Sequence, residues 1–381
     1  MDDRVISFGG SDEEQSYYSG LVAEHGSPLL VLDCAELRNR YRLLQEQLPG
    51  ADLYYAIKAF AHPAALEVLN ELGANFDVAS AGEIDLLKDL QISGRRTIHT
   101  HPIKKDADIK AALRGGSTTF VVDNIDELKK LIPYKQRIGL LLRVSFRSDS
   151  AKIDLSRKFG CAPDQAAELV SQAAELGVHV RGLSFHVGSQ SLTPDTHVDA
   201  IKRCADLIRE IEQREDRPMD VLDIGGGFPV DYSMSGFDAK SYFAPIRTAL
   251  KELPEHISII AEPGRFLIAP AVTGISSVTG KARRGEYLWY YLDDGIYGSY
   301  SGQLFDHTTY PLQIFNHSQE RQRSILAGPT CDSIDIIAED VELPELQEGD
   351  LVIGHMMGAY THATSTRFNS LEAAKIIVVN K

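Results

Sequence analysis

The sequence predicts an α/β protein in which a closed (β/α)8, TIM-like barrel is joined to a second, β-rich domain. Three observations support this. Short β-rich runs alternate with helical segments from Leu53 onward, the alternation stops after Phe266, and polar residues gather where the β-rich runs end. A chain of 381 residues exceeds one ordinary core, so a barrel with an appended domain is a natural division.

Eight β-rich runs account for the barrel. The segments between them carry apolar residues at helical spacing, and clear examples are 63–72, 82–90, 106–113 and 196–212. The β-rich runs cover 53–57, 76–79, 97–100, 119–122, 139–144, 183–187, 221–224 and 257–261. Parallel strands alternating with helices predict a closed barrel. A doubly wound open sheet is the competing architecture, but it does not explain why polar residues gather at so many strand ends.

The part of the chain after Phe266 has strand-like runs with little helical periodicity. These runs cover 274–278, 287–292, 324–327, 351–353 and 374–379. They predict an appended C-terminal β-sandwich or β-barrel domain. The eight barrel runs are complete without the apolar stretch 29–32, so we expect the segment before Pro28 to join this domain. The barrel then covers 28–266, and the β domain covers 1–27 and 267–381.

The acidic composition argues against nucleic acids and anionic membranes as binding partners. Lys and Arg number 39 against 54 Asp and Glu, a formal net charge of −15, whereas nucleic acids and anionic membranes are bound by clustered basic surface. No apolar run approaches the roughly 20 residues that span a bilayer. The start Met1-Asp2-Asp3-Arg4 lacks a signal-peptide pattern. We expect a soluble, cytoplasmic protein that binds neither nucleic acid nor membrane.

The four cysteines are widely scattered, at Cys34, Cys161, Cys204 and Cys331. They form no CxxC pair and no His/Cys cluster at zinc spacing, so we expect reduced thiols and no metal. Three of them are interpreted as small, buried apolar side chains. Cys331 lies in a turn-rich segment of different character.

Lys58 ends the apolar segment Tyr54-Tyr55-Ala56-Ile57. At the end of a buried strand, desolvation disfavours the ammonium, so the amine loses its proton more readily and becomes a nucleophile for an aldehyde. The commoner fate of a lysine is to extend its amine from the surface into solvent. The segment by itself does not decide between these two roles.

Two glycine turns follow the seventh and eighth β-rich runs. They are DIGGGFP, with glycines at 225–227, and AEPGRF, with Gly264 and Arg265. Glycines let backbone N–H groups approach an anion, and phosphate sites of barrels commonly follow the last two strands. A tight turn is the alternative, but the position favours a phosphate site, to which Arg265 adds a charged fork. Together with an amine at Lys58, the turns indicate pyridoxal 5′-phosphate (PLP).

Three side chains near these turns suit such a cofactor. Glu262 is a carboxylate that would keep a pyridine nitrogen protonated, and protonation makes the ring a better electron sink. His186 is able to stack on the ring, and Ser189 to reach the phosphate. The alternatives are a salt-bridged structural glutamate and a structural histidine.

The β domain contains two turn-rich segments with reactive side chains, GPTCDS at 328–333 and MGAY at 357–360. In the first segment Cys331 stands beside Asp332. A thiol in this place is able to deliver a proton, and an acid is able to bind an amine. A Gly-Pro turn with a buried cysteine is the plainer alternative.

Taken together, these motifs resemble the fold-type III, or alanine-racemase-fold, PLP-dependent decarboxylases, and within that group the ornithine decarboxylases. The resemblance covers nearly the whole chain. The matching segments are YYAIK, FDVAS, SFHVGSQ, DIGGGFP, AEPGRF, DDGIYGSY, LFDH, GPTCDSID and MGAYTHA. Each segment is a modest signal, but nine in the order of that family are specific.

The resemblance implies a role for each matching residue. Lys58 binds the PLP aldehyde, Glu262 contacts the pyridine nitrogen and His186 stacks on the ring. Asp77 and Arg143 lie close to the ring. The phosphate-binding positions are Ser189, Gly226, Gly227, Gly264, Arg265 and Tyr360.

The resemblance also implies a head-to-tail homodimer in which Cys331 and Asp332 act in the partner's site. Cys331 guides protonation of the decarboxylated carbon. Asp306 and Asp332 surround the distal ammonium of the substrate, and Tyr297 and Phe368 also line this substrate site. The implied enzyme is a PLP-dependent carboxy-lyase that converts L-ornithine to putrescine and CO2 in polyamine biosynthesis.

Other activities stay open. L-Lysine is one methylene longer than L-ornithine, a difference that commonly changes discrimination by only about 1–3 kcal/mol. Phe305 replaces a tyrosine often found before the matching aspartate, so a lysine or dual lysine/ornithine decarboxylase is the main alternative. A diaminopimelate decarboxylase, whose specificity segment carries an arginine, and an amino-acid racemase, which needs a tyrosine base, are less favoured. Lys58, Glu262 and Cys331 argue against a silent regulator similar to the antizyme inhibitors.

Overall fold

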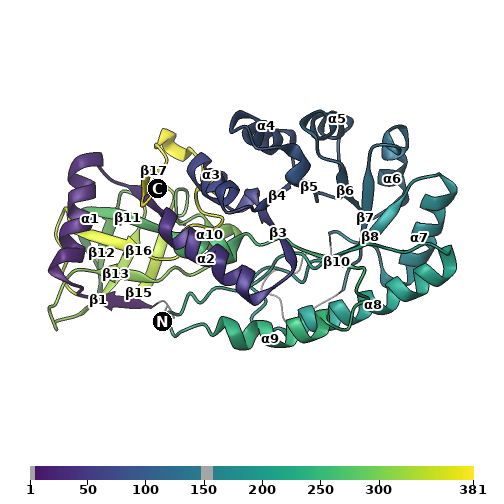
Figure 1. The fold of residues 1–381 in the computed structure, drawn as a ribbon. Helices are drawn as coiled ribbons and strands as arrows, with labels where there is room; N and C mark the ends of the chain where they lie inside the picture. The colour runs from purple at the N-terminus through teal and green to yellow at the C-terminus, as the bar shows by residue number, and fades with distance from the viewer. Residues whose placement is uncertain (1–4, 147–157) are drawn as a thin grey trace. The chain divides into compact units, whose positions relative to one another are not determined.

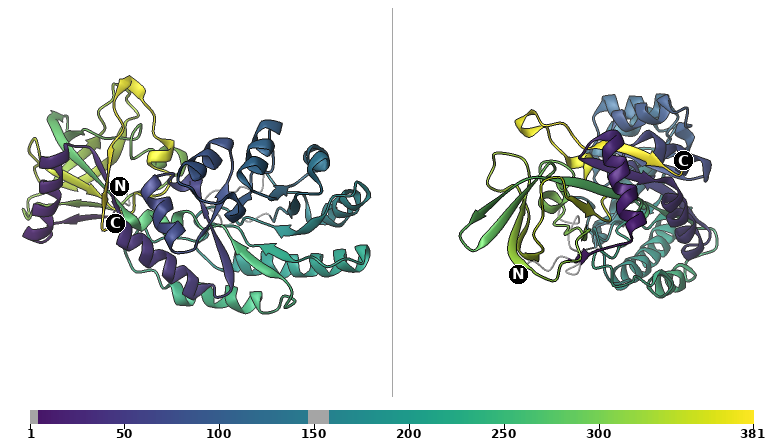
Figure 2. Two further views of the ribbon diagram at one scale, coloured as in Figure 1. Left: turned by 45° about the horizontal axis from the view of Figure 1, so that its top comes forward. Right: turned by 90° about the vertical axis from the view of Figure 1, so that its left-hand side faces the viewer.

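The computed structural model describes residues 5–146 and 158–381 (Figure 1). Residues 1–4, the polar start of the chain, and 147–157 lie outside this description. Two compact units are formed. The barrel unit comprises Arg38–Pro229 and Asp238–Phe266, and the sheet unit comprises Met1–Leu37, Val230–Phe237 and Leu267–Lys381. Each unit is built from more than one stretch of chain, which the colours of Figure 2 make visible.

The barrel unit contains the predicted closed barrel. In the described part of the chain its eight strands are parallel, in the order β10-β3-β4-β5-β6-β7-β8-β9. They are β3 (Ala51–Ala56), β4 (Asn75–Val78), β5 (Thr97–His99), β6 (Thr119–Val122), β7 (Gly139–Arg143), β8 (Val180–Ser184), β9 (Val221–Asp223) and β10 (Ser258–Ala261). Each overlaps a predicted run, because short apolar runs bounded by turn residues identify buried parallel strands. The largest difference is at β8, which begins at Val180, so that the run predicted at 183–187 shares only residues 183 and 184 with it.

Helices alternate with these strands and begin where the sequence provides capping groups. Ser80 Oγ accepts a hydrogen bond from the Glu83 amide, and Asn124 Oδ1 accepts one from the Glu127 amide. Pro63 occupies the first turn of its helix. The helices are α2 (Cys34–Gln47), α3 (Pro63–Glu71), α4 (Ala81–Asp89), α5 (Asp106–Gly115), α6 (Ile125–Leu131), α7 (Pro163–Glu175), α8 (Asp195–Glu215), α9 (Ala239–Leu250) and α10 (Arg265–Ile268).

A layer of apolar side chains fills the interior of the barrel. Tyr54 packs against the buried residues Ile98, Val121, Leu141, Val221 and Ile260. Because side chains alternate along a strand, the residues two positions further along face the same interior. Those residues are Ala56, Thr100, Asp123, Arg143, Asp223 and Glu262. The register agrees, since Asp77 of β4 lies opposite both Ala56 and Ile98. Polar side chains at the strand ends therefore converge on the barrel axis.

The sheet unit is built on a nine-stranded sheet with the path β1-β13-β16-β11-β12-β14-β15. Off this path, β2 pairs with both β11 and β17. The strands are β1 (Ile6–Phe8), β2 (Leu29–Asp33), β11 (Val272–Arg284), β12 (Tyr287–Leu292), β13 (Leu312–Ile314), β14 (Gln322–Ala327), β15 (Ile336–Leu343), β16 (Leu351–Gly354) and β17 (Lys375–Val379). The helices are α1 (Asp12–His25) and α11 (Gly302–Phe305). A separate β domain is thus confirmed.

The expected boundary at Pro28 differs from the division that the structure makes after Leu37. Leu29–Asp33 forms β2, which pairs antiparallel with β11 and parallel with β17 in the sheet unit. Four of its five side chains are buried, so the run resembles a barrel strand in composition. Val230–Phe237 also belongs to the sheet unit. Local pattern identifies a buried strand but does not say which sheet receives it.

Several further expectations concern membranes, metals and cysteines. Within residues 5–146 and 158–381, no helix combines the length and apolarity needed to cross a bilayer. The same residues contain no group of three or more His, Cys, Asp or Glu side chains arranged to hold a metal ion. Cys34, Cys161 and Cys204 are buried, as expected, whereas Cys331 is exposed. The alternative of a buried cysteine in the GPTCDS turn is therefore wrong.

Candidate active site

Lys58 and Asp77 meet at the carboxyl end of the barrel. A single 3-10 turn, Ile57–Ala59, follows β3 and carries Lys58. Lys58 Nζ lies 2.8 Å from Asp77 Oδ2, and the two side chains are 44% and 1% exposed. Thr100 Oγ1 donates to the other carboxylate oxygen, Asp77 Oδ1. The buried carboxylate fixes the amine, while the exposure of the lysine leaves it accessible to a reactant.

Glu262 and Asp223 form a buried carboxyl pair at the ends of β10 and β9. Burial raises the pKa of Glu262 well above its usual range, and the charges of Asp223 and Asp77 raise it further. Burial also raises the pKa of Asp223, but the neighbouring Glu262 and a hydrogen bond from the Gly225 amide oppose that rise. Burial and the nearby carboxylates therefore favour the protonated form of Glu262. A protonated, buried glutamate is a donor suited to a basic ring nitrogen.

His186, just beyond β8, offers a neutral aromatic face. Its Nδ1 accepts a hydrogen bond of 3.0 Å from the Gly188 amide, so Nε2 carries the proton. Burial lowers the pKa of His186 well below its ordinary value, and the charges of Arg143 and Lys58 lower it further. A ring that stays neutral and is held in one orientation suits stacking on an aromatic cofactor.

The turn 225–227 directs all three of its carbonyl groups toward partners in the barrel unit. The contacts are Glu262 N to Gly225 O (2.8 Å), His197 Nε2 to Gly226 O (3.1 Å) and Ser191 N to Gly227 O (2.9 Å). Among the described residues, the amides of Gly226 and Gly227 have no hydrogen-bond acceptor. With its carbonyls occupied, the turn presents two N–H groups to an anion.

Close packing requires glycine in this turn. A β-carbon on Gly226 would lie 2.5 Å from the carbonyl oxygen of Glu262 and 3.4 Å from His186 Nε2. Gly227 has a φ of 90°, which a larger residue rarely adopts. The turn therefore lies directly against the backbone of Glu262 and the ring of His186.

Arg265 and Ser189 add charge and a hydroxyl to this site. Arg265, the first residue of α10, is buried, and its Nη2 donates to Ser189 Oγ at 3.1 Å. Gly264 immediately precedes it. Arg143 ends β7, is partly buried, and has its guanidinium carbon 5.5 Å from the centre of the Phe159 ring. The two amides, the Ser189 hydroxyl and the Arg265 guanidinium match a phosphate, so the residues present fit the phosphate, ring and aldehyde of PLP.

In the sheet unit, Tyr297 joins two residues of the predicted substrate site. Its hydroxyl donates to Asp332 Oδ2, and its ring stacks on Phe368 with 4.7 Å between centroids and 25° between planes. The hydrogen bond to Asp332 raises the pKa of Tyr297 to about 12. The same bond, with the Ile334 amide, lowers the pKa of Asp332. Asp332 is therefore held as a charged carboxylate.

Asp335 fixes the segment that carries Cys331. Its buried carboxylate accepts hydrogen bonds from the Ile296 amide (2.9 Å) and the Thr330 amide (3.0 Å), and so links the segments around Tyr297 and Cys331. The Cys331 amide donates to Asn369 Oδ1 at 3.0 Å. The thiol thus projects from an anchored backbone.

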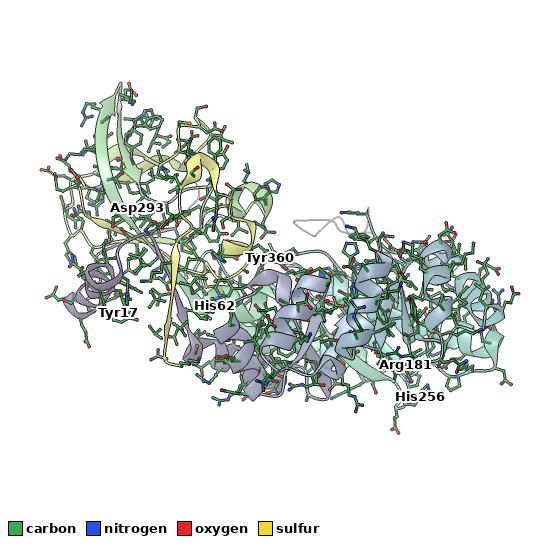
Figure 3. All side chains as sticks on the ribbon, turned by 90° about the horizontal axis from the view of Figure 1, so that it is seen from above. Tyr17, His62, Arg181, His256, Asp293 and Tyr360 are labelled. Carbon is green, nitrogen blue, oxygen red and sulfur yellow. The ribbon has the colours of Figure 1, made fainter. Side chains whose placement is uncertain are left out.

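Asp306 and Tyr360 occupy two other turns of the sheet unit. Asp306 follows α11, is 9% exposed, and accepts a hydrogen bond from Thr308 Oγ1 at 3.0 Å. Tyr360, labelled in Figure 3, has a φ of 56°, and its carbonyl accepts from Thr364 Oγ1 at 2.8 Å. The structure brings Tyr297, Asp332 and Phe368 together, whereas Asp306 and Tyr360 have local partners in separate turns.

Comparison with known proteins adds a decisive observation. Residues 34–269 match the family model described as the pyridoxal binding domain of pyridoxal-dependent decarboxylases. The chain belongs to this family. The cofactor of this decarboxylase is PLP, and its substrate class is the basic amino acids.

Relatives with several substrates share this architecture over most of their length. Lysine/ornithine decarboxylase of Selenomonas ruminantium is 37% identical over 92% of this chain and 89% of its own. The structure of lysine/ornithine decarboxylase from Vibrio vulnificus complexed with cadaverine has a TM-score of 0.93 at 47% identity, covering 97% of this chain and 100% of that one. The arginine decarboxylase of Paramecium bursaria Chlorella virus bound to agmatine has a TM-score of 0.90 at 29% identity, covering 96% and 100%.

Sequence reasoning missed two residues of the site in this decarboxylase. Asp223 opens the DIGGGFP segment, where the glycines are the stronger signal, yet it is a buried carboxyl whose charge raises the pKa of Glu262. Thr100 ends a predicted run and holds Asp77. Both stand two residues beyond an apolar residue of the barrel interior, Val221 or Ile98. That spacing is a signal present in the sequence, and it would have identified both.

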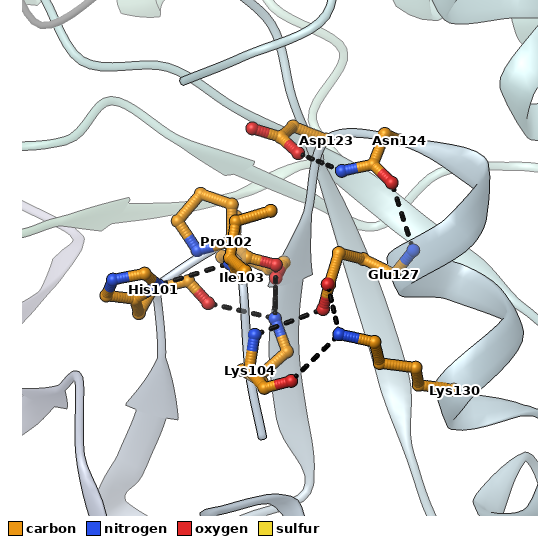
Figure 4. Close-up of polar contacts among 9 residues, drawn as sticks. His101, Pro102, Ile103, Lys104, Asp123, Asn124, Glu127 and Lys130 are labelled. Atoms are coloured by element: carbon orange, nitrogen blue, oxygen red, sulfur yellow. Dashed lines mark hydrogen bonds and ion pairs between the residues drawn. The ribbon is translucent and has the colours of Figure 1, made fainter. Parts of the chain in front are cut away.

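A second lysine of the decarboxylase, Lys104, is structural (Figure 4). Its buried Nζ donates to three carbonyl groups, those of His101 (2.9 Å), Pro102 (2.9 Å) and Val121 (2.5 Å). Burial lowers its pKa to about 8, which Glu127 partly opposes. Glu127 in turn accepts from the Lys104 amide at 3.0 Å. These contacts tie the segment after Thr100 to the end of β6.

Proposed function

We propose that this decarboxylase converts L-ornithine to putrescine and CO2, as a cytoplasmic homodimer with shared active sites. The observation that carries the choice of a diamino acid is the state of Asp332. The hydrogen bond from Tyr297 holds the pKa of Asp332 below its usual range, so the carboxylate stays charged and suits a distal ammonium. Asp306, which resembles the second acidic position of ornithine decarboxylases, is proposed to complete the receptor.

The residues of the barrel unit have separate tasks in this proposal. PLP, when bound, supplies an electron-accepting ring that stabilises the charge left on Cα as CO2 departs. Lys58 would hold the aldehyde carbon through its amine. Glu262 would supply a proton to the ring nitrogen, and the neutral His186 would stack on the ring. Asp77 remains beside the amine and balances its charge.

The sheet unit is proposed to deliver the final proton in the partner's site. Decarboxylation breaks the bond between Cα and the carboxylate and leaves its electron pair on Cα. The thiol of Cys331 then gives its proton to Cα, and the thiolate is neutralised from solvent. The exposure of Cys331 and the anchoring of its amide by Asn369 support this role.

L-Lysine is the second candidate substrate. Phe305, next to Asp306 in the sequence, is 57% exposed, and an apolar side chain at this position is compatible with one more methylene. The similarity to lysine/ornithine decarboxylases supports a dual preference. Because a methylene changes discrimination by only about 1–3 kcal/mol, the two substrates have to be compared directly.

The test is a competition. Purified protein with PLP is given an equimolar mixture of L-ornithine, L-lysine, L-arginine and meso-diaminopimelate, and the products are measured by mass spectrometry. Putrescine in excess supports the proposal. Cadaverine in excess moves the preference to lysine, agmatine moves it to arginine, and a net gain of lysine contradicts the role of Asp332.

A further inference from the structure

His197 lies behind the glycine turn, at the start of α8, and its ring is fully buried. Its Nε2 is 3.1 Å from the carbonyl oxygen of Gly226. Since a carbonyl only accepts, Nε2 carries the proton and donates it. The ring stacks on Phe228 with 4.9 Å between centroids and 9° between planes, and meets the edge of Phe185 at 6.4 Å.

The packing of this ring does not require a histidine. A phenylalanine would pack equally well against the aromatic neighbours on two sides. The other ring nitrogen, Nδ1, is buried with no partner among the described residues. Burying an imidazole nitrogen without a partner is unfavourable. Burial lowers the pKa of His197 to about 4, so the ring is neutral. The bond to Gly226 is the one polar contact of this ring in the described part of the chain.

Gly226 lies against both Glu262 and His186. A β-carbon there would meet Glu262 O at 2.5 Å and His186 Nε2 at 3.4 Å. A rotation of the peptide that follows Gly226 would turn its carbonyl toward an incoming anion and its Gly227 N–H away. Because carbonyl and amide of one peptide point in opposite directions, a donor on the carbonyl fixes the direction of the amide.

We propose that His197 is a positioning residue for the cofactor phosphate, which acts by holding the Gly226 carbonyl so that the Gly227 amide faces the phosphate. This inference rests on the proposed placement of the phosphate at the turn. His197 itself touches neither cofactor nor substrate. It acts through one peptide group, and its removal should weaken binding of the phosphate more than binding of the ring.

The test compares PLP with pyridoxal, which has the same ring and aldehyde but no phosphate. Dissociation constants of both are measured by absorbance titration of the full-length chain. His197→Phe keeps the stack on Phe228 and removes the donor. We expect it to raise the PLP constant roughly three- to tenfold, as for loss of one hydrogen bond, and the pyridoxal constant less than about twofold. His197→Gln restores a donor at similar reach and should recover PLP binding.

His99→Phe is the matched control. His99 is also fully buried and stacks on a phenylalanine, Phe120, at 5.7 Å, but it has no hydrogen bond to the turn. It should leave the ratio of the two constants unchanged. If His197→Phe does not unfold cooperatively, His197→Met is measured in its place.

Two results would overturn the inference. One is an equal change in the constants for PLP and pyridoxal, and the other is no change in either. A wild-type chain that binds PLP no better than pyridoxal would instead refute the proposed phosphate site itself. The two failures are therefore distinguishable.

Discussion

Lys58 Nζ lies 2.8 Å from Asp77 Oδ2, and this pairing distinguishes Lys58, the lysine proposed to bind the aldehyde, from Lys104. A half-exposed amine paired with a carboxylate is able to release its proton and form a new bond. The amine of Lys104 donates to three carbonyl groups, and reaction there would break all three contacts. Two lysines near the same end of the barrel therefore have different chemistry.

Replacement of Lys58 by alanine should abolish multiple turnovers, because it removes the amine proposed to hold the aldehyde. We expect kcat to fall below about one thousandth of the wild-type value, measured as CO2 release with saturating PLP. Lys104→Met is the control. It should lower the thermal midpoint while the chain still forms the coloured PLP complex. Undiminished turnover in Lys58→Ala would refute the assignment.

The carboxyl pair predicts a pH dependence of stability in the PLP-free chain. The pKa of Glu262 is raised in the folded chain above its unfolded value of about 4.5. The pKa of Asp223 is raised from 3.8 in the unfolded chain to about 6 in the folded chain. The folded state therefore binds more protons in this window, and the free energy of unfolding falls as pH rises through it.

Glu262→Gln should make this dependence shallower, because the amide cannot titrate. The measurement is the thermal midpoint of both proteins between about pH 5 and pH 8. A wild-type profile as flat as that of the variant would contradict the raised pKa of Glu262.

Cys331→Ala should reduce kcat about a hundredfold, the lower range for loss of a positioned general acid, and should leave the dissociation constant of PLP unchanged. Products are identified by mass spectrometry together with the rate. Cys204→Ala removes a buried thiol from α8 and serves as the control with full activity. If Cys331→Ala kept both rate and product, the role in protonation would be withdrawn.

Tyr297→Phe keeps the stack on Phe368 but removes the hydrogen bond to Asp332. The carboxylate then loses its fixed orientation, and its pKa rises toward the ordinary value. We expect KM for the diamino acid to rise roughly three- to tenfold with little change in kcat. Tyr291→Phe, whose hydroxyl accepts from Arg284 at 3.1 Å, is the matched control. An unchanged KM in Tyr297→Phe would separate Asp332 from substrate binding.

Shared active sites predict recovery of activity when two inactive variants are mixed. A dimer of Lys58→Ala with Cys331→Ala has one site that lacks both groups and one site that is complete. Random exchange of subunits then restores about a quarter of wild-type activity. The rate is measured after mixed subunits are allowed to exchange, with each variant alone as the baseline. No recovery would place Lys58 and Cys331 of the same chain in one site.

The sequence predicted the barrel, and it predicted which strand ends carry most of the candidate site residues, because the pattern of each strand is local. Lys58, Arg143 and Glu262 each follow an apolar run, and the phase of that run sets the direction of the side chain. The same alternation along the strand applies to Asp223 and Thr100. Asp223, however, stands beside a glycine turn, and Thr100 is the last residue of a predicted run. Their roles depend on contacts with Glu262 and Asp77, which neighbouring strands supply.

The strands of the sheet unit are harder to predict from the sequence than those of the barrel. The sequence does not predict β1, β13 and β15, and it assigns the run that forms β2 to the barrel. Leu29–Asp33 pairs with β17, near the other end of the chain. A pairing between such distant segments cannot be predicted from the residue pattern of either short segment. The link between Tyr297 and Asp332 likewise depends on how two loops meet.

The chain passes between the two units at residues 37/38, 229/230, 237/238 and 266/267. No single cut can release one unit whole. A fragment ending at Phe266 would keep the barrel strands but deprive Leu29–Asp33 of both neighbours, β11 and β17, and leave a buried apolar strand with open edges that invite aggregation. During synthesis all the barrel strands are therefore made before β2 has its neighbours, and this apolar strand stays unpaired on both edges until β11 and then β17 follow.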